Sequence, residues 1–368
     1  MDASLPPFET CLRAVAARDP RWDGRFFTAV TSTGIYCRPI CPARTPKAAN
    51  MRFFASAAAA EEAGFRACLR CRPETAPDMG AWRGTSNTVS RALALIEQGA
   101  LDGGDVEALA GRLGVGERHL RRLFRKHLGA APVSVAQTRR VLLAKQLIHD
   151  SDLPMAEVAL ASGFGSVRRF NETFQHLYGR PPGALRRRRA GERVAGAPIV
   201  LSLAVREPYD WGAMLDALEA RGEWVDNSVW RRQFDEAEGA GEVAVARAGP
   251  GRLEAWFRID RLAGLPGVLA RVRRVLDLAA DPEAIAADLS RDPLLAPLVT
   301  ARPGLRVIGD WDQPDAPGSD RLPESADEVL IERAERWRPW RGYALAHLSA
   351  ADIDPLTLFS ETRHDRAA

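Results

Sequence analysis

Cysteine is scarce in this sequence and is confined to one end of it. Five cysteines occur among 368 residues, and all of them lie before residue 72. No apolar run approaches the roughly 20 residues that a helix needs to cross a bilayer. The first residues also lack the basic and apolar stretches of a secretory signal. We therefore expect a cytoplasmic protein with no membrane partner. In the reducing cytoplasm, closely spaced cysteines bind a metal more often than they form disulfides.

Acidic residues are under-represented in the middle of the chain. Residues 105–189 contain 16 Lys and Arg against 7 Asp and Glu, whereas residues 190–368 contain 22 against 31. Residues 1–104, with 13 against 10, are close to balance. The charge of the middle of the chain thus favours binding to a polyanion such as DNA, whereas the charge of the last half does not.

The length predicts two to four domains. A Pro- and Gly-rich linker near residues 73–84 and a loose segment that follows an arginine run, ending at residue 196, separate regions of different periodicity. We predict a multidomain α+β chain with a small α/β module, an all-α region, and an α+β domain followed by further helices. The predicted boundaries are 1–76, 85–189, 197–300 and 301–368. The last region is expected to contain one amphipathic helix, at residues 326–348.

Four of the cysteines form two close-spaced pairs. Cys37 and Cys41 make a C-x3-C pair, and Cys68 and Cys71 make a C-x2-C pair. Zinc takes four ligands in a tetrahedron, and two thiolates from each of two loops satisfy it. The spacing therefore predicts one Zn²⁺, and by spacing alone a purely architectural one. Cys11 has no nearby partner, and we assign it no role.

The residues around these cysteines resemble a known family. The segments TGIYCRPICPAR (33–44) and GFRACLRCRP (64–73), with ARDP (17–20) and Asp23-Gly24, are similar to the N-terminal domain of the Ada adaptive-response proteins. That resemblance implies that Cys37 irreversibly accepts a methyl group from a methylphosphotriester in DNA, while the other three cysteines are ligands only. Zinc would keep Cys37 as the thiolate, the form that attacks carbon.

Methylation of such a centre would also act as a switch. Zn²⁺ with four thiolates carries a net charge of −2, and methylating one sulfur leaves −1, so repulsion from the DNA backbone falls. Arg44, Arg66 and Arg70 lie beside the ligands in sequence and are candidate phosphate contacts, although solvated surface charge explains them equally well.

The basic middle region reads as two short–long helix pairs. We expect helices at 105–113 and 117–128, then at 155–161 and 166–178, joined by Gly-containing turns. Each second helix buries an apolar stripe and exposes cations, as recognition helices do when they enter successive major grooves. The alternative is a solvated helical bundle. The candidate DNA contacts are Arg118, Arg121, Arg122, Arg125, Arg168 and Arg169.

This region, residues 88–188, resembles the AraC-type DNA-binding domain. The match rests on Ala159, Gly163-Phe164, Phe170, Phe174 and the Gly179–Pro182 stretch. Ada regulators carry this domain after the zinc module, so the domain order agrees. The resemblance implies a monomer that binds a promoter operator in double-stranded DNA, with RNA polymerase as a further partner.

The last half resembles an AlkA-type methyladenine glycosylase in pieces. Residues 208–211, 265–278 and 301–306 match its N-terminal domain and the start of its catalytic domain, and residues 334–348 match its last helix. Only about 27 residues stand where the family has a long helical block with the helix-hairpin-helix and the catalytic aspartate. The absence of cysteine after Cys71 excludes the other Ada ending, an alkylguanine transferase.

We therefore expect residues 301–368 to be a remnant of the glycosylase helical domain. Asp310, Asp312 and Asp315 lie in a Pro/Gly-rich linker without a hairpin to place them, and we interpret them as solvated loop charges. The favoured function is a methylation-activated transcription regulator that repairs one methylphosphotriester per molecule. The alternatives are an active regulator–glycosylase and a zinc-stabilised regulator with an inert Cys37.

Overall fold

The computed structural model describes residues 5–77, 87–186, 197–236, 239–312, 322, 326 and 328–354. These residues form two compact units. The first lies within 1–204, 232–245 and 252–270, and the second within 205–231, 246–251 and 271–368. The mixed α+β class is confirmed, with helices throughout and two sheets. Within the described ranges, no helix is long and apolar enough to span a bilayer. The four-domain division stays a prediction.

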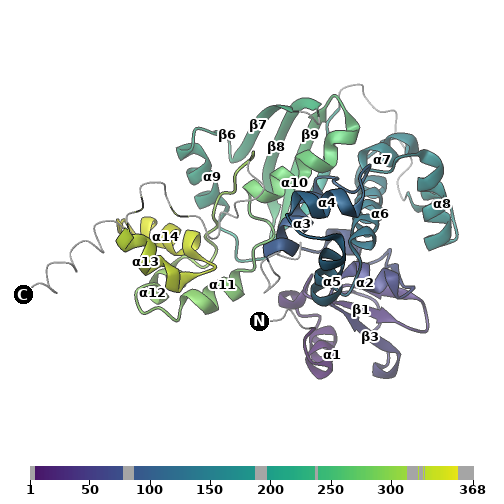
Figure 1. Ribbon diagram of the computed structural model, residues 1–368, viewed down its shortest axis with the longest axis horizontal. Helices are drawn as coiled ribbons and strands as arrows, with labels where there is room; N and C mark the ends of the chain where they lie inside the picture. The colour runs from purple at the N-terminus through teal and green to yellow at the C-terminus, as the bar shows by residue number, and fades with distance from the viewer. Residues whose placement is uncertain are drawn as a thin grey trace, which may run out of the picture. The chain divides into compact units, whose positions relative to one another are not determined.

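Residues 5–77, which we call the cysteine module, contain a four-stranded sheet in the order β3-β1-β2-β4 (Figure 1). Its strands are β1 (Phe27–Val30), β2 (Ile35–Cys37), β3 (Met51–Phe54) and β4 (Arg66–Ala67). Its helices are α1 (Phe8–Ala17), η1 (Pro20–Trp22), η2 (Ala48–Asn50), α2 (Ala57–Glu62) and η3 (Pro73–Thr75). Strands β2 and β4 run parallel, with Tyr36 opposite Ala67. This register places Cys37 and Cys68 next to each other at the ends of neighbouring strands.

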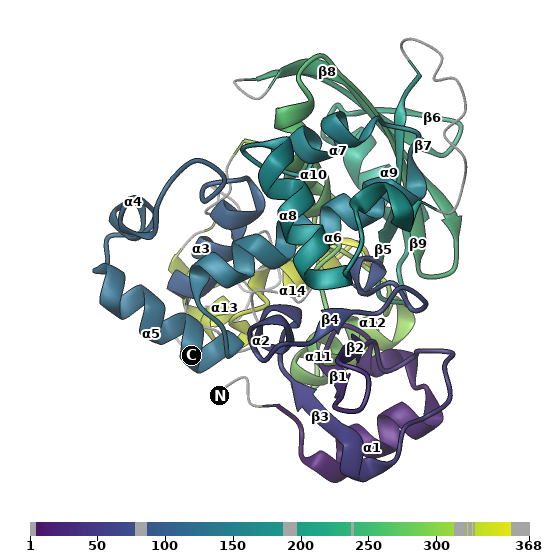
Figure 2. The ribbon, with the colours of Figure 1, turned by 90° about the vertical axis from the view of Figure 1, so that its right-hand side faces the viewer.

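Two short–long helix pairs follow, joined by one long helix (Figures 1 and 2). The helices are α3 (Asn87–Glu97), α4 (Val106–Arg112), α5 (Glu117–Leu128), α6 (Pro132–Asp150), α7 (Met155–Ala161), α8 (Val167–Tyr178) and η4 (Pro182–Leu185). The four predicted helices of the pairs are confirmed to within about one residue at each end. Ser166 caps α8 by accepting from the Arg169 amide, and α5 and α8 end at Gly129 and Gly179, whose φ angles are positive.

The apolar stripes that were predicted for the long helices face the core. Leu120 and Phe124 of α5, and Phe170 and Phe174 of α8, have no exposed surface. Leu123 and Leu177 are only half-buried, and Tyr178 is buried in their place at the end of α8. The cations therefore occupy the outer side of each helix, as the sequence pattern requires.

The last half contains a five-stranded sheet in the order β5-β9-β8-β7-β6. Its strands are β5 (Ile199–Ala204), β6 (Trp224–Asp226), β7 (Val229–Glu236), β8 (Gly239–Gly249) and β9 (Arg252–Ile259). The helices are α9 (Trp211–Ala220), η5 (Leu262–Gly264), α10 (Leu265–Val275), α11 (Pro282–Leu289), α12 (Ala296–Ala301), α13 (Glu328–Ala334), η7 (Glu335–Trp337) and α14 (Arg341–Ser349). Burial alternates along β5 with the two-residue period of a strand, although five of its six residues are apolar.

The single helix predicted at 326–348 is wrong. The chain forms α13, a 3₁₀ turn and then α14, with a break at Arg338 to Trp340. Pro339 has no amide hydrogen to donate and forces the residue before it out of the helical region; Arg338 accordingly has a ψ angle of 140°.

Candidate metal centre and its polar surroundings

The four paired cysteines converge on one point. Their sulfur atoms all lie within 4.8 Å of one another. Cys68 and Cys71 are buried, while Cys37 and Cys41 are half-exposed. A tetrahedron with zinc–sulfur bonds of about 2.3 Å separates its sulfur atoms by about 3.8 Å, so one Zn²⁺ fits between these thiols with little adjustment.

Backbone amides point at the two buried sulfurs. The amide of Arg70 donates to Cys68 Sγ over 3.3 Å, and the amide of Arg38 donates to Cys71 Sγ over 3.4 Å. Hydrogen bonds of this kind stabilise sulfur in its charged form and fix its orientation. The cysteine loops are thus built to present thiolates to a cation.

The thiols of the cluster perturb one another strongly. Hydrogen bonding to Cys41, with burial adding to it, raises the pKa of Cys37. The pKa of Cys41 is lowered to about 7, chiefly because it accepts the hydrogen bond from Cys37. Four sulfurs this close cannot all be thiolates on their own, so they share protons. A divalent cation replaces those protons and removes the repulsion.

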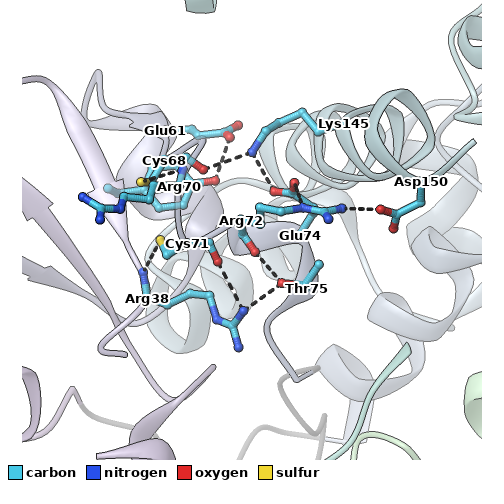
Figure 3. Close-up of polar contacts among 11 residues, drawn as sticks. Arg38, Glu61, Cys68, Arg70, Cys71, Arg72, Glu74, Thr75, Lys145 and Asp150 are labelled. Atoms are coloured by element: carbon cyan, nitrogen blue, oxygen red, sulfur yellow. Dashed lines mark hydrogen bonds and ion pairs between the residues drawn. The ribbon is translucent and has the colours of Figure 1, made fainter. Parts of the chain in front are cut away.

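Arg38 is a structural residue that the sequence interpretation missed. Its guanidinium donates to the buried Asp23 carboxylate, with Nε–Oδ1 at 2.9 Å, and its Nη1 donates to the Cys71 carbonyl over 3.3 Å. Nη1 also donates to Thr75 Oγ1 over 2.7 Å (Figure 3). Arg38 thereby ties the first cysteine loop to the second. Both Arg38 and Asp23 stand inside the motifs quoted above, which was the available signal.

The arginines beside the ligands do not behave alike. Arg44 and Arg70 are exposed. Arg66 is half-buried, and its guanidinium carbon lies 5.8 Å from the centre of the Tyr178 ring at the end of α8. Arg44 and Arg70 therefore face solvent, while Arg66 packs between two parts of the first unit.

All six candidate arginines of the two recognition helices are exposed. Three of them make ion pairs: Arg121 with Glu117, Arg168 with Glu172, and Arg125 with Glu62 of α2. Arg122 lies 3.1 Å from His119 Nδ1. Arg118 and Arg169 have no ion-pair partner among the described residues. These two arginines therefore differ from the other four candidates, a distinction that the sequence pattern could not make.

Cys11 stands apart from the metal cluster. It is completely buried in an apolar group with Phe26 and Met51. Burial raises the pKa of its thiol to about 11, so it is protonated and unreactive at neutral pH. The assignment of no role to Cys11 accords with this position.

The candidate carboxylates of the last half make local contacts. Asp310 Oδ1 accepts from the amide of Asp312 over 2.8 Å, and Asp312 is exposed. Asp315 lies outside the described residues. Elsewhere in the second unit, aromatic groups near the C-terminal helices each donate to a carboxylate. Trp337 Nε1 donates to Asp292 over 2.7 Å, Trp340 Nε1 to Asp288 over 3.0 Å, and the Tyr343 hydroxyl to Asp277.

Three family models match separate parts of the chain. They are described as the metal binding domain of Ada, at residues 10–74, a helix-turn-helix domain, at residues 109–188, and the AlkA N-terminal domain, at residues 200–312. Their order along the chain is the order in which the sequence resemblances occur.

The chain is also similar in sequence to named relatives and to solved structures. A Mycobacterium tuberculosis protein named "Probable bifunctional transcriptional activator/DNA repair enzyme AlkA" is 40% identical over 308 residues, which cover 82% of this chain and 62% of that protein. The "Crystal structure of the methylated N-ADA/DNA complex" is 37% identical and covers 36% of this chain and 97% of its own, with a TM-score of 0.18. The refined structure of the DNA methyl phosphotriester repair domain of E. coli Ada is 46% identical, covering 19% and 76%, with a TM-score of 0.18.

A further relative is covered over most of its length. The "Bifunctional transcriptional activator/DNA repair enzyme AdaA" of Bacillus subtilis is 30% identical over 176 residues, which cover 47% of this chain and 80% of that protein. With the Ada metal-binding and helix-turn-helix matches and a four-cysteine cluster built for zinc, this chain belongs to the Ada family of transcriptional regulators and DNA repair proteins.

Proposed function

We propose that this protein repairs methylphosphotriesters in DNA by transferring the methyl group to Cys37, and that the transfer raises its affinity for promoter DNA. The observation that carries the proposal is the uneven exposure of the four cysteine residues. Cys68 and Cys71 are buried, which leaves Cys37 and Cys41 as the thiolates within reach of a substrate. The family resemblance then selects Cys37.

The step balances with no further reactant. The Cys37 thiolate attacks the methyl carbon, a carbon–sulfur bond forms, and the carbon–oxygen bond of the phosphotriester breaks. The leaving oxygen keeps the electron pair and becomes part of an ordinary phosphodiester anion. Zinc supplies a deprotonated sulfur at neutral pH. Because the thioether is stable, each molecule acts once.

The consequence for DNA binding is electrostatic. Transfer changes the net charge of a zinc centre with four thiolates from −2 to −1. The exposed Arg44 and Arg70 stand beside it, and the exposed arginines of α5 and α8 supply the main attraction to phosphates. Less negative charge at the centre lowers the repulsion that opposes them. We place RNA polymerase as a partner at the promoter, the protein in the cytoplasm, and the active form as a monomer.

The test compares duplex binding before and after exposure to a methylphosphotriester duplex, with Cys37→Ala alongside and the zinc content of both proteins measured. The proposal expects tighter binding after transfer, and no change in the variant. Equal affinity before and after transfer, at full zinc content, would leave the alternative of a zinc-stabilised regulator in which the cysteines serve as scaffold.

We also propose that the C-terminal half has no glycosylase activity. A glycosylase needs a carboxylate that faces the sugar, and a pocket for a flipped base. Asp277, Asp288 and Asp292 instead accept hydrogen bonds from the aromatic residues near α14, and Asp310 bonds to its own loop. Release of methyladenine from methylated DNA, lost on mutation of one aspartate, would establish the bifunctional alternative.

A further inference from the structure

One buried ion pair joins the cysteine module to the helices that carry the recognition arginines. Lys145, in the middle of α6, has 0% exposed side chain, and Glu74 of η3 has 1%. Lys145 Nζ lies 2.6 Å from Glu74 Oε2 and donates to the carbonyl of Cys68 over 3.4 Å (Figure 3). A metal-cluster residue is thus bonded through its backbone to α6.

Other polar contacts run between the same two regions. Arg72, next to Cys71, pairs with Asp150 at the end of α6 over 2.8 Å. Glu61 of α2 accepts from Thr138 Oγ1 of α6 over 2.6 Å, and from the hydroxyl of Tyr36, the neighbour of Cys37, over 3.0 Å. Thr138 and Lys145 are seven residues apart and so lie on one face of the helix. Both cysteine loops are therefore fixed to α6.

The docking extends to the end of the first recognition helix. Ser56 Oγ donates to the carbonyl of Leu128, the last residue of α5, over 2.7 Å. Glu62 accepts from the amide of Ala131 over 2.8 Å and pairs with Arg125. Arg66 also stacks on Tyr178 of α8, with its guanidinium carbon 5.8 Å from the ring centre. The module thus touches both recognition helices and the helix that connects them.

The ion pair is not explained by stability. A well-packed apolar pair often replaces a buried ion pair with no loss of stability, because removing two charges from water offsets their attraction. A buried ion pair instead specifies the relative position of the two elements that carry it. Any arrangement that separates the charges leaves each of them buried without a partner, which is unfavourable. Lys145 and Glu74 are therefore best explained as a device that sets how the module sits on α6.

We propose that Lys145 is a positioning residue that holds Cys37 in fixed register with α5 and α8, so that the methylated centre and the two recognition helices contact one DNA duplex together. The inference rests on the proposed function and adds to it the residue that couples its two halves. Linked modules bind more tightly than separate ones only when their geometry allows both to engage at once. Without the pair, the chain would still link the two parts, but the buried contact between η3 and α6 would be lost.

The test uses the full chain with the double variant Lys145→Met and Glu74→Gln, which removes both charges and leaves neither buried alone. The matched control is Arg258→Met with Glu242→Gln, which removes an ion pair on the sheet of the same unit. Each protein is loaded with zinc, and methyl uptake from a methylphosphotriester duplex is followed by intact mass. Affinity is then measured, before and after uptake, for a duplex selected from a random pool by the methylated wild type.

We expect the double variant to take up one methyl group at a rate within about threefold of wild type, while its gain in affinity falls at least tenfold. The control should keep both. An unchanged gain in the double variant overturns the proposal. Loss of zinc or of methyl uptake in that variant also overturns it, because the pair would then serve the cysteine module alone. A wild type that takes up no methyl group refutes the proposed function, and the coupling with it.

Discussion

The cysteine module and the C-terminal unit use their buried and half-buried polar groups in opposite ways. In the module, Glu61, Glu74 and Arg72 bond to residues of α6, so they connect one functional part to another. In the C-terminal unit, Asp277, Asp288 and Asp292 are bonded by Tyr343, Trp340 and Trp337 of the same unit. The contacts of the cysteine module fix the position of one part of the first unit relative to another. The contacts of the C-terminal unit stabilise that unit alone.

This difference bears on how residues 301–368, which we propose to be a remnant of a glycosylase domain, keep a folded structure. Three aromatic side chains of the C-terminal helices donate hydrogen bonds to carboxylates within residues 277–292. These carboxylates therefore serve the packing of the helices. The cysteine module shows the reverse, because its buried network leaves Cys37 and Cys41 half-exposed at the edge of the cluster. The proposed reactive cysteine and the internally bonded carboxylates therefore lie in different parts of the chain.

The largest expected effect is on methyl transfer. Cys37→Ser should abolish methyl uptake, since an alcohol bound to zinc is a poor nucleophile toward a methyl carbon. Cys11→Ala is the matched control and should take up one methyl group as wild type does, because the Cys11 thiol is buried and protonated. Intact-mass spectrometry reads both. Methyl uptake by Cys37→Ser would move the nucleophile to another cysteine.

Removing zinc should unfold the cysteine module and spare the C-terminal unit. A structural zinc contributes on the order of 10 kcal/mol to the folding of a small module, whereas nothing in the second unit resembles a zinc site among its described residues. Six of the 9 tryptophans lie in the second unit, so most of the fluorescence reports on that unit. A chelator should make the four paired cysteines alkylatable and leave most of the fluorescence unchanged. If the fluorescence changed together with the alkylation of the cysteines, the two units would unfold as one.

Asp277 should make the C-terminal unit sensitive to pH. Burial raises the pKa of its carboxyl from 3.8 to about 6, although the bond from Tyr343 opposes the shift. The protonated form is therefore favoured in the fold, and the stability it contributes is complete below about pH 4 and lost as pH rises through about 6. Asp277→Asn should gain about 2 kcal/mol relative to wild type between pH 4 and pH 7.

That gain is measured as a difference between urea unfolding curves of the two proteins, followed by tryptophan fluorescence. The difference is needed because burial lowers the pKa of His347 in the same unit to about 4, which destabilises both proteins equally at low pH. A difference that does not change with pH would mean that Asp277 is charged in the fold.

The smallest expected effect separates two arginines of α5. Arg118 has no ion-pair partner in the part of the chain that the structure describes, whereas Arg121 pairs with Glu117 one turn earlier. Arg118→Ala should lower the salt dependence of DNA binding, d log K/d log [salt], by about 0.9, the value for one lost phosphate contact. Arg121→Ala should lower it less, because Glu117 already offsets that charge. An equal change in d log K/d log [salt] for both variants would show that the ion pair with Glu117 does not weaken the phosphate contact of Arg121.

The sequence predicted the metal site and the helix pairs well, because both are local patterns. The cysteine spacing and the i, i+3, i+4 stripes of α5 and α8 depend only on near neighbours. The break at Pro339 was missed although proline signals it, since the amphipathic pattern continues on both sides. Lys145 and Glu74 could not be paired from the sequence, because 71 residues separate them and a buried lysine in a basic helix looks like a surface one.

The most direct test of the account is the mass of the protein after incubation with a duplex that carries one methylphosphotriester, followed by mapping of the modified peptide. The account predicts a gain of one methyl group per molecule, on Cys37, with zinc retained. No mass gain in a zinc-loaded protein, or a methyl group on Cys41 or any other residue, would contradict it.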